Sequence, residues 1–376
     1  MKLFHCSSCD QRVFFENTRC ESCGSSLGFV PQEREMVAFS ADEFWNRLGL
    51  SGPAQRPCAN YAVEGVCNWM LDASDAAQLC VSCRTTHIIP ALGNPENRTY
   101  WLLLEQAKRR LFYTLMALEL PTPNKQADPV HGVSFQFLEA VSPQHCVLTG
   151  HDQGVITLNI AEADDVLREK ARSRLHEPLR SLVGHFRHES GHYYWDRLVK
   201  GSSWIEEFRQ IFGDERAAYD EALSRHYATP VVGWHLNFIS AYASAHPWED
   251  WSECWAHYLH MVDGLETAAA WGLHLDHATP AGPPLQAMAL SANAGSIEPS
   301  LVEQWLPISQ FTNSMNRSLG LHDSYPFVVP APVVTKLEFV HRVIGAVQRG
   351  EATMNFALAT PASNGDSATS VAAPVD

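Results

Sequence analysis

Eight of the ten cysteines lie within the first 83 residues, in two groups of four, and their spacing constrains the fold of this part of the chain. The first group contains two Cys-x-x-Cys pairs separated by ten residues, a spacing at which four thiolates can surround a tetrahedral zinc ion. Gly24 follows the second pair, where a tight turn favours a residue without a Cβ. We therefore predict a zinc ribbon over residues 1–35. Its cysteines are Cys6, Cys9, Cys20 and Cys23.

The second group is looser, because only two of its cysteines form a Cys-x-x-Cys pair. Four cysteines within 26 residues still suggest a second four-cysteine zinc module over residues 58–90. A cluster without metal remains the alternative at this stage. Residues 36–57 are expected to be a linker with one short helix near residues 41–45. The cysteines of this group are Cys58, Cys67, Cys80 and Cys83.

The composition limits the compartment and the partners. Zinc is a better explanation of the paired cysteines than disulfides, because the first residues lack the apolar segment of an export signal. We expect a cytoplasmic protein without membrane partners, since no run of 18 apolar residues occurs. The formal net charge of -15 and the nearly balanced charges of residues 1–35 argue against nucleic acid as a partner.

The remainder of the chain is mainly helical in pattern. Apolar residues recur at helical spacing over residues 95–120, whereas residues 131–160 alternate and predict two or three strands. A long amphipathic run from 163 to 200 is interrupted by Pro178, and further helices are suggested at 202–226, 231–245, 248–262 and 335–350. We expect a mostly α fold with small β parts, a domain over 91–356, and a disordered tail over 357–376.

The segment His188-Glu189-Ser190-Gly191-His192 carries the chemistry of this helical domain. Histidines four residues apart on a helix can bind the same zinc ion, and the intervening Glu189 can accept a proton from a metal-activated water. Gly191 is unusual inside a helix, and its lack of a side chain would allow another helix to approach the metal closely.

Two acidic residues downstream could complete this zinc site. Glu249 and Glu253 are four residues apart, in a helix expected to begin after Pro247. One can bind the metal while the other holds a ligand histidine through its second ring nitrogen. The spacing does not choose between them, and acids in the first turn also stabilise a helix without any metal.

His188-Glu-x-Gly-His192, followed by Tyr242-x6-Glu249-x3-Glu253, resembles the gluzincin metallopeptidases, in particular the type of site found in anthrax lethal factor. The resemblance implies that Glu249 is the third zinc ligand, that Glu253 supports a ligand histidine, and that Tyr242 stabilises the tetrahedral intermediate. Residues 1–350 also resemble a bacterial family of zinc-binding metallopeptidases with an N-terminal zinc ribbon, and this resemblance favours metal in both cysteine groups.

These features predict a peptidase with one catalytic zinc and one or two structural zinc ions, acting on a peptide or protein substrate. Glu189 is the expected general base, and Tyr242 or His246 is the expected donor to the oxyanion. The alternative is a non-catalytic adaptor that binds a protein partner through the zinc ribbon. The presence of Glu189 argues against it, because a scaffold does not need a general base.

Overall fold

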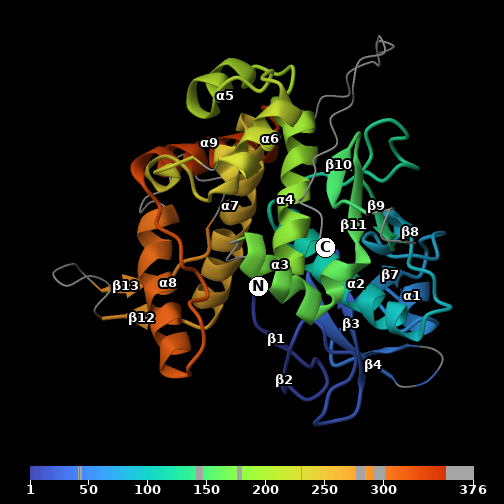
Figure 1. Ribbon diagram of the computed structural model, residues 1–376. Helices are drawn as coiled ribbons and strands as arrows, with labels where there is room; N and C mark the ends of the chain where they lie inside the picture. Colours follow the sequence, from blue (N-terminus) through green and yellow to red (C-terminus); the bar gives the residue numbers. More distant parts are fainter. Residues whose placement is uncertain are drawn as a thin grey trace.

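A computed structural model gives the structure of the protein, which describes residues 1–40, 42, 45–140, 147–175, 180–229, 231–276, 284–290 and 301–352 (Figure 1). The predicted tail over 357–376 lies outside the described residues, as do Ala41, Glu43 and Phe44 of the predicted short helix. Among the described residues, none of the helices is both long and apolar enough to cross a lipid bilayer.

The N-terminal quarter consists of small antiparallel sheets around the two cysteine groups. β1 pairs with β2, β3–β4–β5 form a three-stranded sheet, and β6 pairs with β7. Residues 36–57 therefore supply strands, where the sequence suggested a linker, because β4 pairs along its whole length with β3. The elements are β1 Phe4–His5, β2 Arg12–Val13, β3 Ser26–Val30, β4 Glu35–Phe39, β5 Arg47–Leu48, β6 Gln55–Pro57, α1 Ala59–Ala62 and β7 Met70–Asp72.

This region shares its hydrophobic core with the helical domain. Phe15, Phe29 and Trp69 form an aromatic cluster that includes Tyr113 of α2 (Pro95–Ala117), with Phe15 and Phe29 centroids 4.9 Å apart. Small cysteine-rich segments bury little apolar surface by themselves, so packing on a long helix supplies the missing core. The zinc ribbon and the helical domain are thus one packed unit in this structure.

One mixed sheet connects the second cysteine group to the rest of the chain. Its strand order is β10-β11-β9-β8, and β8 pairs in parallel with β9, across the predicted boundary at residue 90. The described part of 131–160, without residues 141–146, contains three strands, within the two or three that their alternation predicted. The elements are the 3-10 turn Cys83–Thr85, β8 Thr86–Ile88, β9 Ser134–Leu138, β10 Gly150–Asp152, β11 Val155–Asn159 and the 3-10 turn Ile160–Ala163.

Two helices packed side by side, α4 (Leu182–Tyr194) and α7 (Pro247–Ala270), form the centre of the molecule (Figure 1). The mixed sheet lies to one side of this pair, and α8 lies on the other side. α4 continues into a π-helical turn, Trp195–Val199, a feature often found near functional sites. The mostly α fold with small β parts is therefore confirmed.

The remaining elements surround α4 and α7. Residues 231–245, all described, contain only 3-10 turns instead of the predicted α-helix; Gly233 has a left-handed backbone and Val232 and Leu236 are exposed, so no continuous apolar helix face packs on the core. The elements are α3 Asp165–Leu175, α5 Ile205–Phe212, α6 Tyr219–Ala228, the 3-10 turns Trp234–Leu236 and Tyr242–Ser244, β12 His274–Leu275, β13 Leu285–Gln286, α8 Leu301–Ser318 and α9 Ala331–Gln348.

Candidate metal centre

α4 presents both histidines of the His-Glu-x-x-His segment on one face. Ser181 caps the helix, its hydroxyl accepting a hydrogen bond of 3.0 Å from the backbone N–H of Gly184. His188 and His192 then lie one turn apart, with their Nε2 atoms 3.2 Å from each other. This convergence is what the i, i+4 spacing predicted for two ligands of one metal.

α7 presents the two carboxylates. His246 caps this helix, with Nδ1 accepting from the backbone N–H of Trp248 at 3.1 Å, and Pro247 occupies the first turn. Glu249 is fully buried and Glu253 lies one turn further along the same face. Both glutamates reach the histidines of α4, but they contact different atoms.

Gly191 brings the two helices together at this point. A Cβ on Gly191 would lie 2.9 Å from Cα and 3.0 Å from Oγ of Ser252, which is closer than side chains pack. The indole N–H of Trp251 donates to the carbonyl oxygen of Gly191 at 2.8 Å and fixes the contact. The glycine in α4 is thus explained by the close approach of α7, as the sequence suggested.

Three candidate ligand atoms converge at the centre of the helix pair. Glu249 Oε2 lies 3.0 Å from His188 Nε2 and 3.4 Å from His192 Nε2. A tetrahedral zinc ion with ligand bonds of about 2.0–2.1 Å separates its ligands by roughly 3.3 Å. The three residues form one of the candidate metal-binding groups of the described chain. The separations therefore fit a zinc ion.

The charges and hydrogen bonds of this group also fit a cation. Glu249 Oε2 is buried and has no hydrogen-bond partner, a costly state for an oxygen unless a cation faces it. Burial by itself would raise the pKa of Glu249, but the facing imidazoles of His192 and His188 hold that pKa well below its usual value. The carboxylate is thus kept ionised, as a metal ligand must be.

Glu253 contacts the other ring nitrogen of His188 and lies outside the group of three candidate ligands. Its Oε1 lies 2.8 Å from His188 Nδ1, which leaves His188 Nε2 to face the other candidate ligands. Its Oε2 accepts a hydrogen bond of 2.6 Å from the hydroxyl of Ser240. Such a carboxylate–histidine contact orients a metal-binding imidazole and increases its basicity.

The structure adds two residues that the sequence did not indicate. Ser240 holds Glu253, and the phenol of Tyr219 donates to Glu249 Oε1 at 2.6 Å. Both lie outside the His-Glu-x-x-His and Glu-x-x-x-Glu segments. No sequence signal marks them, because both contacts join residues that are distant in the sequence from their glutamate partners on α7.

The expected catalytic side chains lie around the same group. Glu189 is 5% exposed, and the ring centroid of Tyr242 is 5.9 Å from that of His188. Burial raises the pKa of Tyr242 well above its usual value, and the charges of Glu249 and Glu189 add to this effect. The Tyr242 phenol therefore keeps its proton and can act as a donor.

His246 is placed differently from Tyr242. Besides capping α7 through Nδ1, it lies with Nε2 at 3.2 Å from the carbonyl oxygen of Ala217, so both ring nitrogens are engaged. Burial lowers the pKa of His246, and the neutral ring suits these two contacts. In this arrangement the ring contributes to the start of α7.

The first cysteine group forms a compact cluster of four sulfurs. Cys6 and Cys23 have their Sγ atoms 3.7 Å apart, and those of Cys9 and Cys20 are 3.6 Å apart. Zinc–sulfur bonds of about 2.3 Å place the thiolates of a tetrahedral site roughly 3.8 Å apart. Cys6 and Cys20 are buried, whereas Cys9 and Cys23 are exposed.

The second cysteine group forms a similar cluster, despite its looser spacing. All four of its cysteines are buried, and the sulfurs of Cys67 and Cys80 are 3.9 Å apart. Backbone N–H groups point at the sulfurs, for example Cys80 N at 3.3 Å from Cys58 Sγ. The structure therefore assembles both groups as candidate four-thiolate sites.

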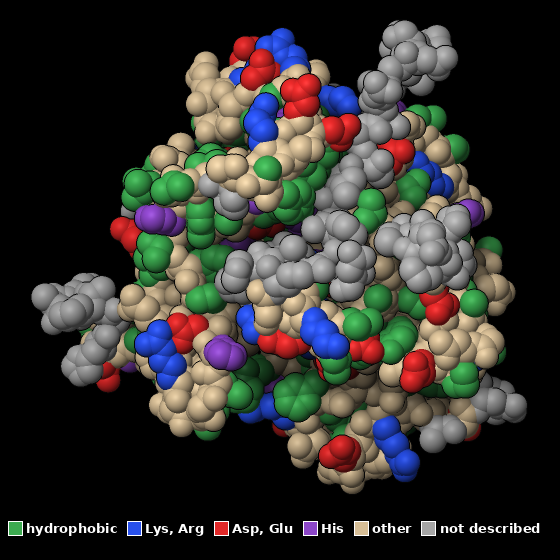
Figure 2. All heavy atoms as spheres, in the orientation of Figure 1, with side chains coloured by type: hydrophobic (Ala, Val, Ile, Leu, Met, Phe, Trp, Pro, Cys, Tyr) green, Lys and Arg blue, Asp and Glu red, His purple; other side chains and the backbone are tan. Residues whose placement is uncertain are grey.

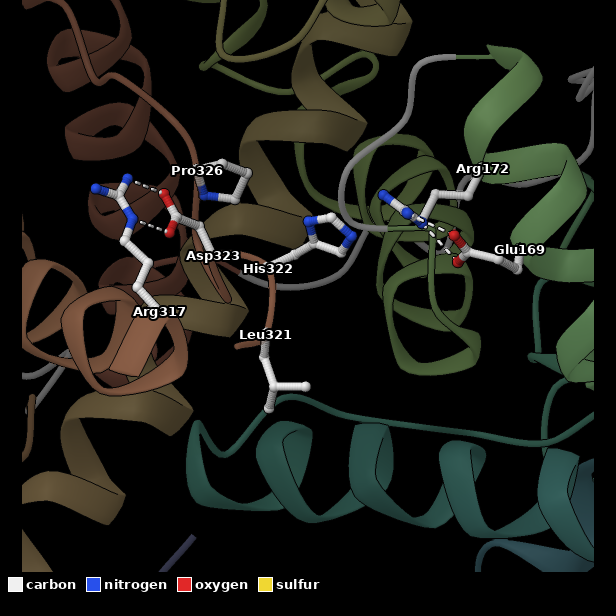
Figure 3. Close-up of a pocket in the computed structure, with 7 residues that line it drawn as sticks. All are labelled: Glu169, Arg172, Arg317, Leu321, His322, Asp323 and Pro326. Atoms are coloured by element: carbon white, nitrogen blue, oxygen red, sulfur yellow. Dashed lines mark hydrogen bonds and ion pairs between the residues drawn. The ribbon is translucent and has the colours of Figure 1, made fainter. Parts of the chain in front are cut away.

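A separate pocket of about 780 Å³ lies between α3 and the residues that follow α8 (Figure 3). Glu169 pairs with Arg172 on one wall, and Arg317 pairs with Asp323 on the other. Basic and acidic side chains are also interspersed over the face of the molecule shown in Figure 2. Because the pocket contains none of the candidate ligands, we do not place the chemistry there.

The fold and these three clusters are those expected of a zinc-binding protein, with a candidate His-His-Glu metal site in its helical domain. Comparison with known proteins points to the same class of protein. The chain belongs to the family described as "Putative zinc-binding metallo-peptidase", whose model matches residues 97–343. A zinc-ribbon domain model matches residues 3–94 and thus spans both cysteine groups.

Mycobacterial relatives cover nearly the whole chain. Uncharacterized proteins of Mycobacterium tuberculosis and Mycobacterium bovis are 42% identical to it over 349 residues, which is 92% of this chain and 96% of each relative. No solved structure matches the chain. The resemblance to a zinc-binding metallopeptidase family with a zinc ribbon is confirmed at the level of the family.

Proposed function

We propose that this protein is a zinc-dependent peptidase in which His188, His192 and Glu249 hold the catalytic metal. The observation that carries the proposal is the convergence of their three ligand atoms at separations of 3.0, 3.2 and 3.4 Å. When bound, zinc would polarise the scissile carbonyl group and lower the pKa of a water molecule. Three protein ligands leave a fourth position open, as catalytic zinc sites require.

Glu189 acts as the general base in this proposal. It follows His188 directly on α4, so its carboxylate lies beside the metal position without being one of the three ligands. The carboxylate accepts a proton from the attacking water and passes it to the leaving amine. Its burial supports this role, because water is largely excluded from around the carboxylate.

Tyr242 is the proposed donor to the developing oxyanion. It is protonated and lies next to His188, whereas both nitrogens of His246 are engaged by the backbone. Of the two candidates from the sequence, the geometry therefore favours Tyr242. His246 contributes by starting α7 about one turn before Glu249 and two turns before Glu253, which positions both glutamates.

Replacing Glu189 by Gln tests the proposal. The amide keeps the shape of the side chain but cannot accept the proton, so peptide hydrolysis should fall by roughly 100-fold or more. Zinc content, measured by mass spectrometry on the native protein, should remain unchanged. A Glu189→Gln protein with normal zinc and wild-type hydrolysis would contradict the proposal, as would a wild-type protein without metal at this site.

A further inference from the structure

We propose that Tyr219 makes Glu249 bind the metal through one carboxylate oxygen. Its phenol holds the other oxygen in a hydrogen bond, so that only one is free to bind. This inference rests on the proposed function, in which Glu249 is a zinc ligand. It makes Tyr219 a positioning residue, because its phenol touches a ligand and none of the reacting atoms.

The two oxygens of Glu249 have different surroundings. The hydroxyl of Tyr219 donates to Oε1 at 2.6 Å, whereas Oε2 faces the two histidine Nε2 atoms and accepts no hydrogen bond. Glu249 is fully buried and Tyr219 is 8% exposed, so bulk water competes little for this hydrogen bond. The phenol therefore distinguishes the two oxygens before any metal arrives.

The hydrogen bond from Tyr219 limits how many bonds the Glu249 carboxylate can make to the metal. A carboxylate can bind a metal through one oxygen or through both. A catalytic zinc site needs a position for water and substrate besides its three protein ligands. By occupying Oε1, Tyr219 disfavours two-oxygen binding by Glu249 and keeps that position available.

The ring of Tyr219 is fixed by the same segment that carries Glu249. Its centroid is 5.2 Å from that of His246 and 5.8 Å from that of Trp248, both with edge-on geometry. These two residues are the cap and the first turn of α7, directly before Glu249. A phenylalanine at position 219 would keep these ring contacts and remove only the hydroxyl group.

The test compares Tyr219→Phe with the wild-type full-length protein after exchange of the catalytic metal for cobalt(II), with the cysteine clusters left in their zinc form. Four-coordinate cobalt(II) absorbs visible light more strongly than five-coordinate cobalt(II). We expect the visible bands of Tyr219→Phe to weaken, and its zinc affinity to fall by roughly 10-fold or more. Tyr227→Phe, an exposed tyrosine on the same helix, is the matched control and should change neither property.

Unchanged cobalt bands and unchanged zinc affinity in a folded Tyr219→Phe protein would overturn the assignment of Tyr219. X-ray absorption at the cobalt edge of the wild-type protein gives a test without any variant. One carboxylate oxygen on the metal is the expected result, and two would overturn the inference. Failure of the wild-type site to bind cobalt or zinc would instead overturn the proposed function. Failure of the Tyr219 inference can therefore be distinguished from failure of the proposed function.

Discussion

Among single residues, Glu249 and Glu253 have different relations to the histidines, although they lie on one helix face. Glu249 Oε2 lies near the Nε2 atoms of His188 and His192, whereas Glu253 Oε1 lies 2.8 Å from His188 Nδ1. Removing a ligand destroys a metal site, while removing its orienting partner weakens binding by roughly 10–100-fold. We therefore expect Glu249→Ala to abolish zinc binding at this site and Glu253→Ala to weaken it within that range.

Competition titrations with a colorimetric zinc chelator would measure both affinities, and Glu169→Ala, on α3 and outside the candidate ligand set, is the control. Equal losses in the two variants would show that the assignment of Glu249 and Glu253 is wrong. The spacing placed both acids on one helix but could not rank them, because the ranking depends on which ring nitrogen of His188 each acid approaches; only the family resemblance assigned Glu249 as the ligand. The sequence did not indicate Tyr219 or Ser240, whose hydrogen bonds reach 30 and 13 residues along the chain to Glu249 and Glu253.

His257 provides a second prediction at the same scale. Burial lowers its pKa to about 4, the charge of Glu253 opposes this shift, and Nδ1 lies 2.8 Å from the hydroxyl of Tyr325. Between pH 6.5 and 4 the unfolded chain binds a proton at His257 that the native protein does not, so the free energy of unfolding falls as the pH falls. A shift from 6.5 to about 4 corresponds to about 3 kcal/mol.

We expect His257→Gln to lose less of its free energy of unfolding than the wild type over this pH range. Urea denaturation at pH 7 and pH 5 would measure the difference. His274→Gln, at a more exposed histidine, is the control and should follow the wild type. Parallel pH dependences for His257→Gln and the wild type would refute the prediction.

At the scale of elements, the site depends on the distance between α4 and α7. A methyl group at position 191 would meet backbone and side-chain atoms of Ser252 at 2.9–3.2 Å, and the backbone cannot move as a flexible side chain can. Gly191→Ala should therefore push the helices apart, lower the free energy of unfolding by about 1–3 kcal/mol, and reduce zinc affinity. Gly93→Ala adds the same methyl group where nothing lies within 4 Å.

Thermal unfolding and zinc titration of the two variants would check this prediction. A Gly191→Ala protein as stable and as rich in zinc as Gly93→Ala would show that the close contact is unimportant.

The sequence was informative about the contact between α4 and α7, since a glycine inside an amphipathic helix suggested a close neighbour. It was misleading over 231–245, where the predicted helix is absent, two 3-10 turns occur instead, and Val232 and Leu236 are exposed.

At the scale of the whole molecule, the two cysteine clusters differ in how deeply they lie in the structure. The second cluster is buried completely, and the strand that follows it, β8, pairs with β9 of the helical domain. The first cluster has two exposed cysteines at the edge of the molecule. The sequence predicted both clusters from spacing but placed a domain boundary at residue 90, because strand pairing between distant segments leaves no local signal.

This difference predicts an order of metal loss. A chelator should first remove the zinc of the helical domain, where His188 is partly exposed and one position is open, and peptide hydrolysis should stop at that point. The zinc of the first cysteine cluster should follow more slowly, and that of the second should leave only as the chain unfolds, since structural zinc contributes directly to folding. Zinc counted by mass spectrometry, with circular dichroism recorded in parallel, follows the three steps. Three zinc ions per chain, of which one is lost first together with peptide hydrolysis, would support the peptidase. Two tightly held zinc ions with no third would favour a non-catalytic adaptor.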